Sequence, residues 1–232
     1  MRSPALLLSQ RVPCEPKMTD GQADRLRAAL RLFLLADPGL VPAGSLAVAV
    51  EAALRGGVTA VQLRSKDATT AELLELARTI NALCRERDVP LIVNERVDVA
   101  LAAEADGAHV GQLGEEEESP TEARHLLGPD AIVGVSVTSP QEARQATSQG
   151  ASYISAGPMF NSAGELVGEE LLRHVRAATR LPLVVIGGIT AKRAGSLYAA
   201  GADGVCVGAA ILRSADVEGA ARAFAQSMGR TT

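Results

Sequence analysis

Three long polar side chains, Gln62, Arg64 and Lys66, alternate along one short stretch of the chain. Alternate side chains of a β-strand point to the same face, so an amide and two cations would share one face. Burying three such groups in an apolar layer is costly, whereas an open mouth lets them meet an anion. Lys66 is also the only lysine between residues 18 and 191. We therefore predict an anion-binding site here, the alternative being that both cations lie on the outer surface.

A second polar group follows an apolar stretch. Asn94 and Glu95 come directly after residues 91–93, and Asp98 lies three residues further on. An amide followed by carboxylates is suited to contact a ligand or a metal ion. The alternative is a helix N-cap at Asn94 with acids in the first turn.

Hydroxyl groups, an imidazole and glycines complete the set of candidate residues. Ser136 either contacts a ligand or caps the helix that follows it, and His109 is expected to support its neighbours. The glycines of residues 187–188 and of Gly208-Ala209 expose backbone N–H groups that can hold a phosphate.

These residues belong to a regular alternation of strand-like and helix-like segments without a hairpin signal. Such alternation predicts a parallel sheet with right-handed crossovers, and eight units predict a single (β/α)8 TIM barrel of the α/β class. The predicted strands are Leu32–Ala36, Ala60–Arg64, Leu91–Asn94, Ala108–Val110, Ile132–Ser136, Tyr153–Ala156, Leu183–Ile186 and Gly204–Val207. The predicted helices are Ser45–Arg55, Thr70–Arg87, Arg96–Ala103, Pro120–Leu127, Pro140–Gln149, Glu169–Thr179, Ala191–Ala199 and Val217–Met228.

An internal repeat supports this architecture. Residues 104–111 resemble residues 201–208, which lie 97 positions later (107 to 204), and residues 150–157 are a looser copy. With roughly 24 residues per unit, that offset corresponds to four units, or half a barrel. In this fold the strands carry the site at their C-terminal ends, and phosphate often binds after strands seven and eight. The candidate residues are therefore predicted to meet at one mouth.

Composition limits the class of protein. The 232 residues are 47% hydrophobic and carry a net charge of −4, which excludes a disordered chain. With 27 acidic against 23 basic residues and 2% aromatic residues, no nucleic-acid partner is expected. The three cysteines form no disulfide framework, and no apolar run is long enough to cross a membrane. We expect a cytoplasmic protein with an irregular N-terminal extension at residues 1–27 and a barrel domain at residues 28–232. The sequence leaves its oligomeric state open, homo-oligomers included.

In combination, seven motifs resemble the family of thiamine phosphate synthase and its relative, the thiazole tautomerase. The resemblance spans roughly residues 31–227, and the motifs occur in the family's order and at its distances. They are Gln62-x-Arg64-x-Lys66, Val93-Asn94 with an acid, Asp106-Gly-x-His109-x-Gly-Gln112, Gly134-Val-Ser136, Gly157-Pro158-x-Phe160, Ile186-Gly-Gly-Ile189 and Gly201-Ala-Asp-Gly204.

The resemblance implies a transferase that joins two small phosphorylated substrates. Hydroxymethylpyrimidine diphosphate loses pyrophosphate, and the nitrogen of a thiazole phosphate captures the resulting pyrimidinyl-methyl cation to give thiamine phosphate. Mg²⁺ and basic residues stabilise the leaving group. By matching positions, the pyrimidine diphosphate would be held by Gln62, Arg64, Lys66, Asn94 and Ser136, of which Arg64, Lys66 and Ser136 would be catalytic. The thiazole phosphate would be held by Ser162, Gly188, Gly208 and Ala209.

The sequence departs from the family pattern at the metal ligands and after the sixth strand. Glu95 stands where the family has an aspartate ligand of Mg²⁺, and Gly114 replaces a second aspartate, with Glu115 as a weak substitute. Losing a carboxylate is expected to weaken Mg²⁺ binding. In the loop at Ser162, Glu165 reverses the charge of the family's lysine.

Two alternatives to the transferase remain open. One is a non-catalytic or repurposed barrel that binds a phosphate or pyrimidine ligand, which the departures at Gly114 and Glu165 favour. The other is an isomerase like the thiazole tautomerase, but that enzyme uses a histidine near the position where this chain has Thr138, which counts against this alternative. Retention of all three polar side chains in residues 62–66 favours diphosphate recognition, and hence the transferase.

Overall fold

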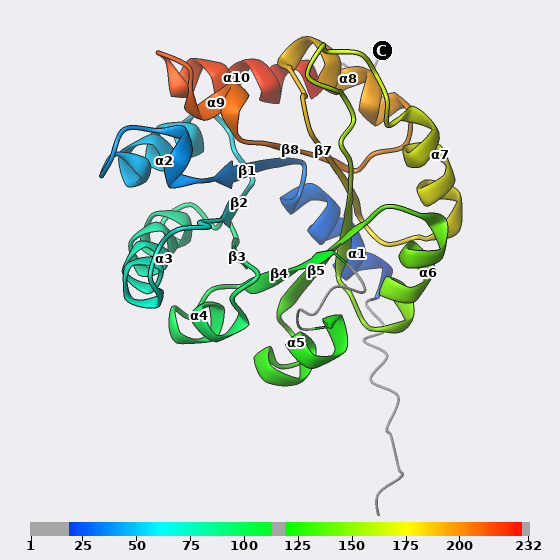
Figure 1. Cartoon of the computed structure of the whole chain (residues 1–232), viewed down its shortest axis with the longest axis horizontal. Helices are drawn as coiled ribbons and strands as arrows, with labels where there is room; N and C mark the ends of the chain where they lie inside the picture. Colours follow the sequence, from blue (N-terminus) through cyan, green and yellow to red (C-terminus); the bar gives the residue numbers. More distant parts are fainter. Residues whose placement is uncertain (1–18, 113–118, 229–232) are drawn as a thin grey trace, which may run out of the picture.

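The computed structural model describes residues 19–112 and 119–228, in which eight strands close into a barrel in the order β1 to β8. Every neighbouring pair is parallel, including β1 with β8, and helices surround the barrel (Figure 1). The strands are β1 (Leu32–Ala36), β2 (Ala60–Leu63), β3 (Leu91–Asn94), β4 (Gly107–Gln112), β5 (Ile132–Val137), β6 (Tyr153–Ala156), β7 (Leu183–Ile186) and β8 (Gly204–Val207). The helices are α1 (Asp20–Ala29), α2 (Leu46–Arg55), α3 (Thr70–Arg85), α4 (Val97–Ala102), α5 (Pro120–Leu127), α6 (Pro140–Ser148), α7 (Glu169–Ala178), α8 (Ala191–Ala199), α9 (Ala209–Leu212) and α10 (Val217–Met228), with a 3₁₀ turn η1 (Pro38–Leu40).

The predicted (β/α)8 barrel is confirmed. All eight predicted strands and all eight predicted helices are present, and their bounds differ from the prediction by two residues at most. Three observed elements were not predicted: α1, η1 and α9. Within the described residues, no helix is long and apolar enough to cross a membrane.

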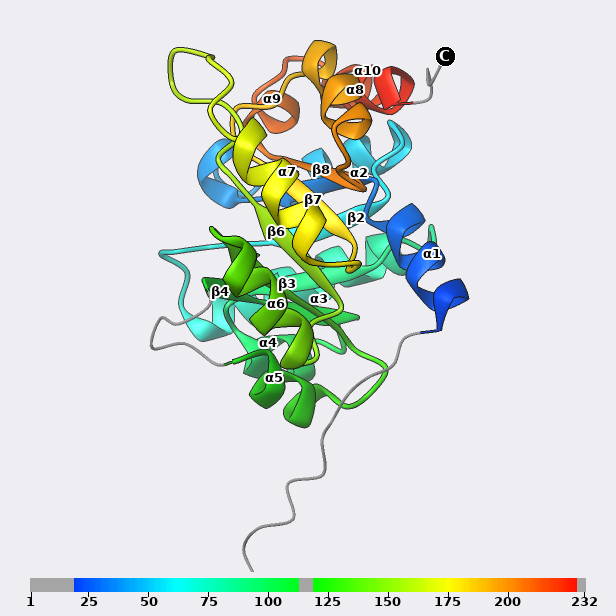
Figure 2. The same ribbon diagram turned by 90° about the vertical axis from the view of Figure 1, so that its right-hand side faces the viewer.

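Helix α1 corrects the expectation that residues 1–27 are irregular. Thr19 caps it, accepting a hydrogen bond from the N–H of Gln22, whose side chain bonds back to the Thr19 N–H. Leu26 and Leu30 at its C-terminal end pack into the barrel interior. Figures 1 and 2 show α1 lying across one end of the barrel, so this helix belongs to the barrel domain. Residues 1–18 lie outside the described residues.

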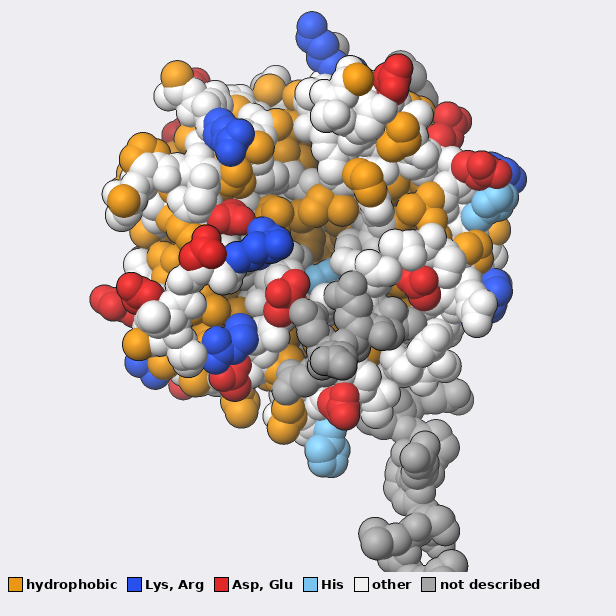
Figure 3. All heavy atoms as spheres, viewed as in Figure 1, with side chains coloured by type: hydrophobic (Ala, Val, Ile, Leu, Met, Phe, Trp, Pro, Cys, Tyr) orange, Lys and Arg blue, Asp and Glu red, His pale blue; other side chains and the backbone are white. Residues whose placement is uncertain are grey.

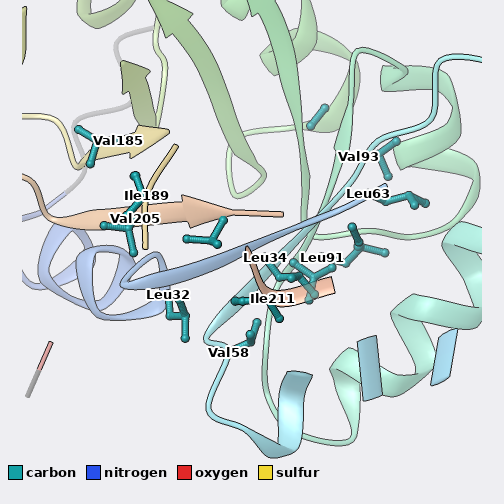
Figure 4. Packing of buried hydrophobic residues seen from close by; sticks show 14 of the residues in the cluster. Leu32, Leu34, Val58, Leu63, Leu91, Val93, Val185, Ile189, Val205 and Ile211 are labelled. Atoms are coloured by element: carbon teal, nitrogen blue, oxygen red, sulfur yellow. The ribbon is translucent and has the colours of Figure 1, made fainter. Parts of the chain in front are cut away.

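Side chains alternate between two cores. Residues of the strands that point outward, such as Leu34 and Val93, pack under the helices in one large cluster (Figure 4). Their neighbours that point inward, such as Phe33 and Ile92, form a smaller cluster inside the barrel. Because the inner cluster fills the end closed by α1, the opposite end is left for polar side chains.

Each copy of the internal repeat makes an equivalent hydrogen bond to the start of a neighbouring strand. Asp106 before β4 accepts a hydrogen bond from the N–H of Leu91 at 2.8 Å, and Asp203 before β8 accepts one from Leu183 at 2.9 Å. In the looser copy, Ser152 accepts one from Val133 at 3.0 Å. Each copy thus ties the entrance of one strand to the start of a neighbouring strand, and β4 and β8 stand half a barrel apart as predicted.

Candidate active site

The barrel opens into a cavity of about 430 Å³ at the C-terminal ends of its strands. Figure 3 shows this face of the molecule, with a hollow near its middle and both acidic and basic side chains at the edge. Polar groups from the five neighbouring strands β2 to β6 and hydrophobic groups from β1, β7 and β8 meet here. The lining residues are Phe33, Leu35, Gln62, Arg64, Asn94, Glu95, His109, Gly111, Gln112, Ser136, Ser155, Val184, Ile186 and Cys206.

A second cavity of about 490 Å³ adjoins the first. It lies over the ends of β1, β7 and β8 and is lined by the glycine loops that follow β7 and β8. Leu35, Arg64, Ile186 and Cys206 line both cavities. Arg64 therefore stands at the boundary between them and is the cation that both share.

An ion pair fixes the position of Arg64. Its guanidinium contacts the Asp37 carboxylate at 3.0 Å, and about a quarter of each side chain is exposed. The other carboxylate oxygen of Asp37 accepts a hydrogen bond from the N–H of Gly39 at 2.8 Å, so Asp37 is the N-cap of η1. Asp37 thus connects the end of β1 to the shared cation. Sequence reasoning missed this residue because a lone acid after a strand is indistinguishable from a cap.

Three of the predicted pyrimidine-diphosphate residues line the first cavity together with Arg64. Gln62 and Asn94 are buried at the ends of β2 and β3, and Ser136 is half-buried on β5. Asn94 is not a helix cap, since Arg96 occupies the N-cap position of α4. Ser136 faces the cavity, whereas Thr138 binds the Glu142 carboxylate at the start of α6.

Lys66 and Ser162 lie apart from this group. Strand β2 ends at Leu63, so the alternation that would align Lys66 with Arg64 does not extend that far. Both Lys66 and Ser162 are exposed, and neither is among the described residues that line the two cavities. In the loop of Ser162, the Glu165 carboxylate accepts a hydrogen bond from the Asn161 amide at 2.7 Å.

A buried chain of hydrogen bonds lies at the bottom of the first cavity. His109 Nδ1 contacts the Tyr153 hydroxyl at 2.9 Å, and its Nε2 contacts Ser136 Oγ at 3.0 Å. Ser136 Oγ in turn contacts Ser155 Oγ at 3.0 Å. Burial lowers the pKa of His109 to about 4 and raises that of Tyr153 well above 10. Both groups are therefore neutral at neutral pH, and His109 joins Tyr153 to Ser136.

Close packing explains the glycines of the second cavity. Gly187 and Gly188 have positive φ angles of 100° and 66°. A Cβ on Gly187 would lie 2.7 Å from Pro158, and one on Gly188 would lie 2.7 Å from Phe160. The loop after β6 is therefore pressed onto the end of β7, which brings backbone rather than side chains to the cavity wall.

The start of α9 forms the other wall of the second cavity. Gly208, Ala209 and Ala210 line it. Because the first N–H groups of a helix have no acceptor within that helix, those of Ala209 and Ala210 are suited to bind an anion.

Glu95 is the carboxylate at the rim of the first cavity. It is exposed and has a φ of 65°, an uncommon conformation for a residue with a side chain, and its N–H donates to the carbonyl of His109 at 2.8 Å. Across residues 19–112 and 119–228, no group of three His, Cys, Asp or Glu side chains is placed to hold a metal ion. Gly114 and Glu115 lie outside the described residues. One carboxylate beside a polar cavity still suits Mg²⁺, which often binds through one or two carboxylates and the phosphates of a substrate.

The closed α/β barrel has at its mouth a cavity with one arginine, Arg64, beside glycine loops, a combination suited to phosphorylated small molecules. Residues 32–211 match the family model described as thiamine monophosphate synthase, and the chain belongs to this family. It is 47% identical over 186 residues to the thiamine-phosphate synthase of Moorella thermoacetica, covering 78% of this chain and 87% of that protein. It is also 45% identical over 200 residues to the thiamine-phosphate synthase of Xanthobacter autotrophicus, covering 84% and 93%.

Solved structures agree with this assignment. The thiamine phosphate pyrophosphorylase of Pyrococcus furiosus superimposes with a TM-score of 0.79 at 36% identity, covering 88% of this chain and 97% of that one. The (S)-3-O-geranylgeranylglyceryl phosphate synthase of Thermoplasma acidophilum, at 21% identity and a TM-score of 0.66, shares the fold.

Proposed function

We propose that the chain is a thiamine phosphate synthase, a transferase that condenses hydroxymethylpyrimidine diphosphate with thiazole phosphate. The observation that carries this proposal is the pair of adjoining cavities with Arg64 in the wall of both. The reaction needs two phosphorylated substrates side by side, with positive charge where the leaving group departs. One cavity offers buried amides and hydroxyls for a heterocycle, and the other offers backbone N–H groups for a phosphate.

In the proposed assignment, the first cavity holds the pyrimidine diphosphate. Gln62, Asn94 and Ser136 hold the heterocycle, and Arg64 binds the diphosphate. Lys66 belongs to the proposal as a second cation, on the loop that follows β2. The walls from β1, β7 and β8 are apolar, so the ring is held away from bulk water and each polar contact is strengthened.

The second cavity is assigned to the thiazole phosphate. The N–H groups of Gly188, Gly208 and Ala209 bind the phosphate, with Ser162 as a further contact from the loop after β6. Backbone donors fixed by close packing need no rearrangement to bind an anion.

The bond changes follow from this placement. The C–O bond between the pyrimidinyl methylene and the diphosphate breaks, and both electrons leave with pyrophosphate. Arg64 stabilises the negative charge that develops there, an interaction that is stronger in the transition state than in the ground state. The thiazole nitrogen then donates its electron pair to the methylene carbon, which forms the new C–N bond. Neutral His109 adds no positive charge beside the developing cation.

Mg²⁺ is part of the proposal. Glu95 would hold it together with the oxygens of the diphosphate, and when bound it would neutralise charge on the departing pyrophosphate. An aspartate ligand is replaced by Gly114, so we expect a higher Mg²⁺ requirement than two carboxylates would give.

Turnover tests the proposal. Purified protein with both substrates and Mg²⁺ is expected to form thiamine phosphate and pyrophosphate in equal amounts. Absence of product over a wide Mg²⁺ range, in protein shown to be folded by circular dichroism, would reject the synthase. Pyrophosphate binding that does not respond to Mg²⁺ would instead favour the non-catalytic barrel. Conversion of the thiazole substrate alone would favour the isomerase.

A further inference from the structure

The buried hydrogen-bond chain connects the closed interior of the barrel to the wall of the first cavity. It begins at Tyr153, which is fully buried, passes through both nitrogens of His109, and continues to Ser136 and Ser155. The two serines line the cavity, whereas Tyr153 does not. A polar side chain at one end of this chain can therefore act on a ligand at the other end only through its neighbours.

The chemistry of the groups sets the direction of the chain. A phenol is a good hydrogen-bond donor and a poor acceptor, and a neutral imidazole nitrogen is a good acceptor, so the Tyr153 hydroxyl donates to His109 Nδ1. Burial lowers the pKa of His109 and raises that of Tyr153, which keeps both groups neutral. With Nδ1 acting as an acceptor, the single ring hydrogen is on Nε2, and Nε2 donates to Ser136 Oγ.

The direction of these hydrogen bonds determines which hydroxyl hydrogen faces the cavity. Tyr153 donates to His109, His109 to Ser136, and Ser136 to Ser155, so the Ser155 hydrogen is left to point into the cavity. When a ligand acceptor approaches Ser136 instead, the Ser136 hydrogen can serve it. In either case the serine pair offers a donor, and the imidazole cannot accept from it.

We propose that Tyr153 and His109 are positioning residues that fix the Ser136–Ser155 pair as a hydrogen-bond donor toward a ring nitrogen of the substrate. The identity of that ring as an aminopyrimidine rests on the proposed function. The direction of the chain does not rest on it, because the direction is inferred from the hydrogen-bonding chemistry of the residues and the tautomer of His109 tests it separately. Ser155 thereby becomes a specificity-determining residue, since a heterocycle without an acceptor at that position would leave the donor unpaired.

Close packing holds the Tyr153 ring in one position, so its hydroxyl stays next to His109 Nδ1. A Cβ on Gly134 would lie 2.1 Å from Tyr153 Cζ and 2.4 Å from its hydroxyl oxygen. The Tyr153 ring therefore fills the space that a side chain at position 134 would need. The Phe33 ring packs against it edge-on with centroids 5.8 Å apart, and the imidazole lies 5.6 Å away. The hydroxyl is thus held at one place relative to Nδ1.

The first test reads the tautomer of His109 in the ligand-free protein by ¹⁵N NMR of labelled histidine. The chain has three histidines, and the buried ring of His109 is identified by its lowered pKa of about 4 and by the loss of its signals in His109→Gln. The expected result is a neutral ring protonated on Nε2 alone. A proton on Nδ1 alone, or an imidazolium at pH 7, would overturn the proposal. This result does not depend on whether thiamine phosphate is formed.

The second test separates the heterocycle from the diphosphate by calorimetry. Two probes are used, the free hydroxymethylpyrimidine alcohol and inorganic pyrophosphate, with Tyr153→Phe and Ser155→Ala. Each variant is expected to bind the alcohol about three- to tenfold more weakly, the range for loss of one hydrogen bond, and pyrophosphate within twofold of wild type. Alcohol affinity that stays unchanged in Tyr153→Phe would refute the positioning role.

The chain offers a matched control in Tyr198→Phe. Tyr198 is the only other tyrosine, and its hydroxyl donates to the carbonyl of Arg31 at the end of the barrel away from the cavity. This variant should leave both affinities unchanged. If it weakens alcohol binding as much as Tyr153→Phe does, the effect comes from general destabilisation and the proposal fails. If Tyr153→Phe does not fold, the tautomer and Ser155→Ala decide the matter.

Discussion

Replacement of Arg64 or Lys66 by alanine should affect pyrophosphate binding to very different extents. Arg64 lines both cavities with 28% of its side chain exposed, so a charge-assisted hydrogen bond from it should contribute about 1.5–3 kcal/mol. Arg64→Ala should thus raise the Kd for pyrophosphate about ten- to hundredfold. Lys66 is exposed and outside the cavity lining, so screening should limit the effect of Lys66→Ala to less than about fivefold. Calorimetry at fixed Mg²⁺ and ionic strength measures both, and equal losses would refute the assignment of Arg64 as the shared cation.

Asp37 provides an internal control for this prediction. Without Arg64, its carboxylate would stand unpaired, and at a separation of about 6 Å it would repel a bound anion by roughly 0.7–3 kcal/mol. Asp37→Asn removes the charge but keeps an oxygen for the N–H of Gly39. In the Arg64→Ala background, Asp37→Asn should therefore recover threefold or more of the lost affinity. A further loss would show that Asp37 acts on the anion in another way.

Three further predictions concern stability. Gly134→Ala should destabilise the fold by about 1–3 kcal/mol because its Cβ would meet Tyr153, whereas Gly21→Ala, with open space in α1, should be neutral or stabilising; thermal unfolding compares them. Burial lowers the pKa of His109 from its usual 6.5 to about 4 in the folded state, so the unfolded chain binds a proton first as the pH falls. The free energy of unfolding should therefore decrease by up to about 3 kcal/mol between pH 6.5 and pH 4. Urea unfolding at pH 7 and 4.5 should show this loss in wild type and not in His109→Gln. Leu30→Ala, at the end of the barrel closed by α1, should lower the free energy of unfolding by about 2–5 kcal/mol. The KM values should stay unchanged at low temperature, and a changed KM would contradict the view that this end acts independently of the site.

The barrel could be predicted because its signals are local. The strands are short, mainly apolar runs with glycine, proline or aspartate residues near their ends, and the repeated segments at β4 and β8 mark half a barrel. The polar residues at strand ends could be placed for the same reason, since all parallel strands end at one mouth. Gln62, Arg64, Asn94 and Ser136 therefore line a common cavity.

What could not be predicted depends on tertiary contacts. Helix α1 is mostly polar, and only its contact with the barrel interior distinguishes it from an extension. Lys66 continues the alternation in the sequence, but the strand ends three residues earlier. Ser155 is one small polar residue in an apolar strand, and its importance depends on having Ser136 beside it in the neighbouring strand.

A crystal structure with thiamine phosphate and pyrophosphate bound would test the central claim most directly. We expect pyrophosphate oxygens within hydrogen-bond distance of the Arg64 guanidinium, and the thiazole phosphate on the N–H groups of Gly188 and Ala209. Pyrophosphate bound elsewhere on the molecule, with Arg64 still paired only to Asp37, would contradict it.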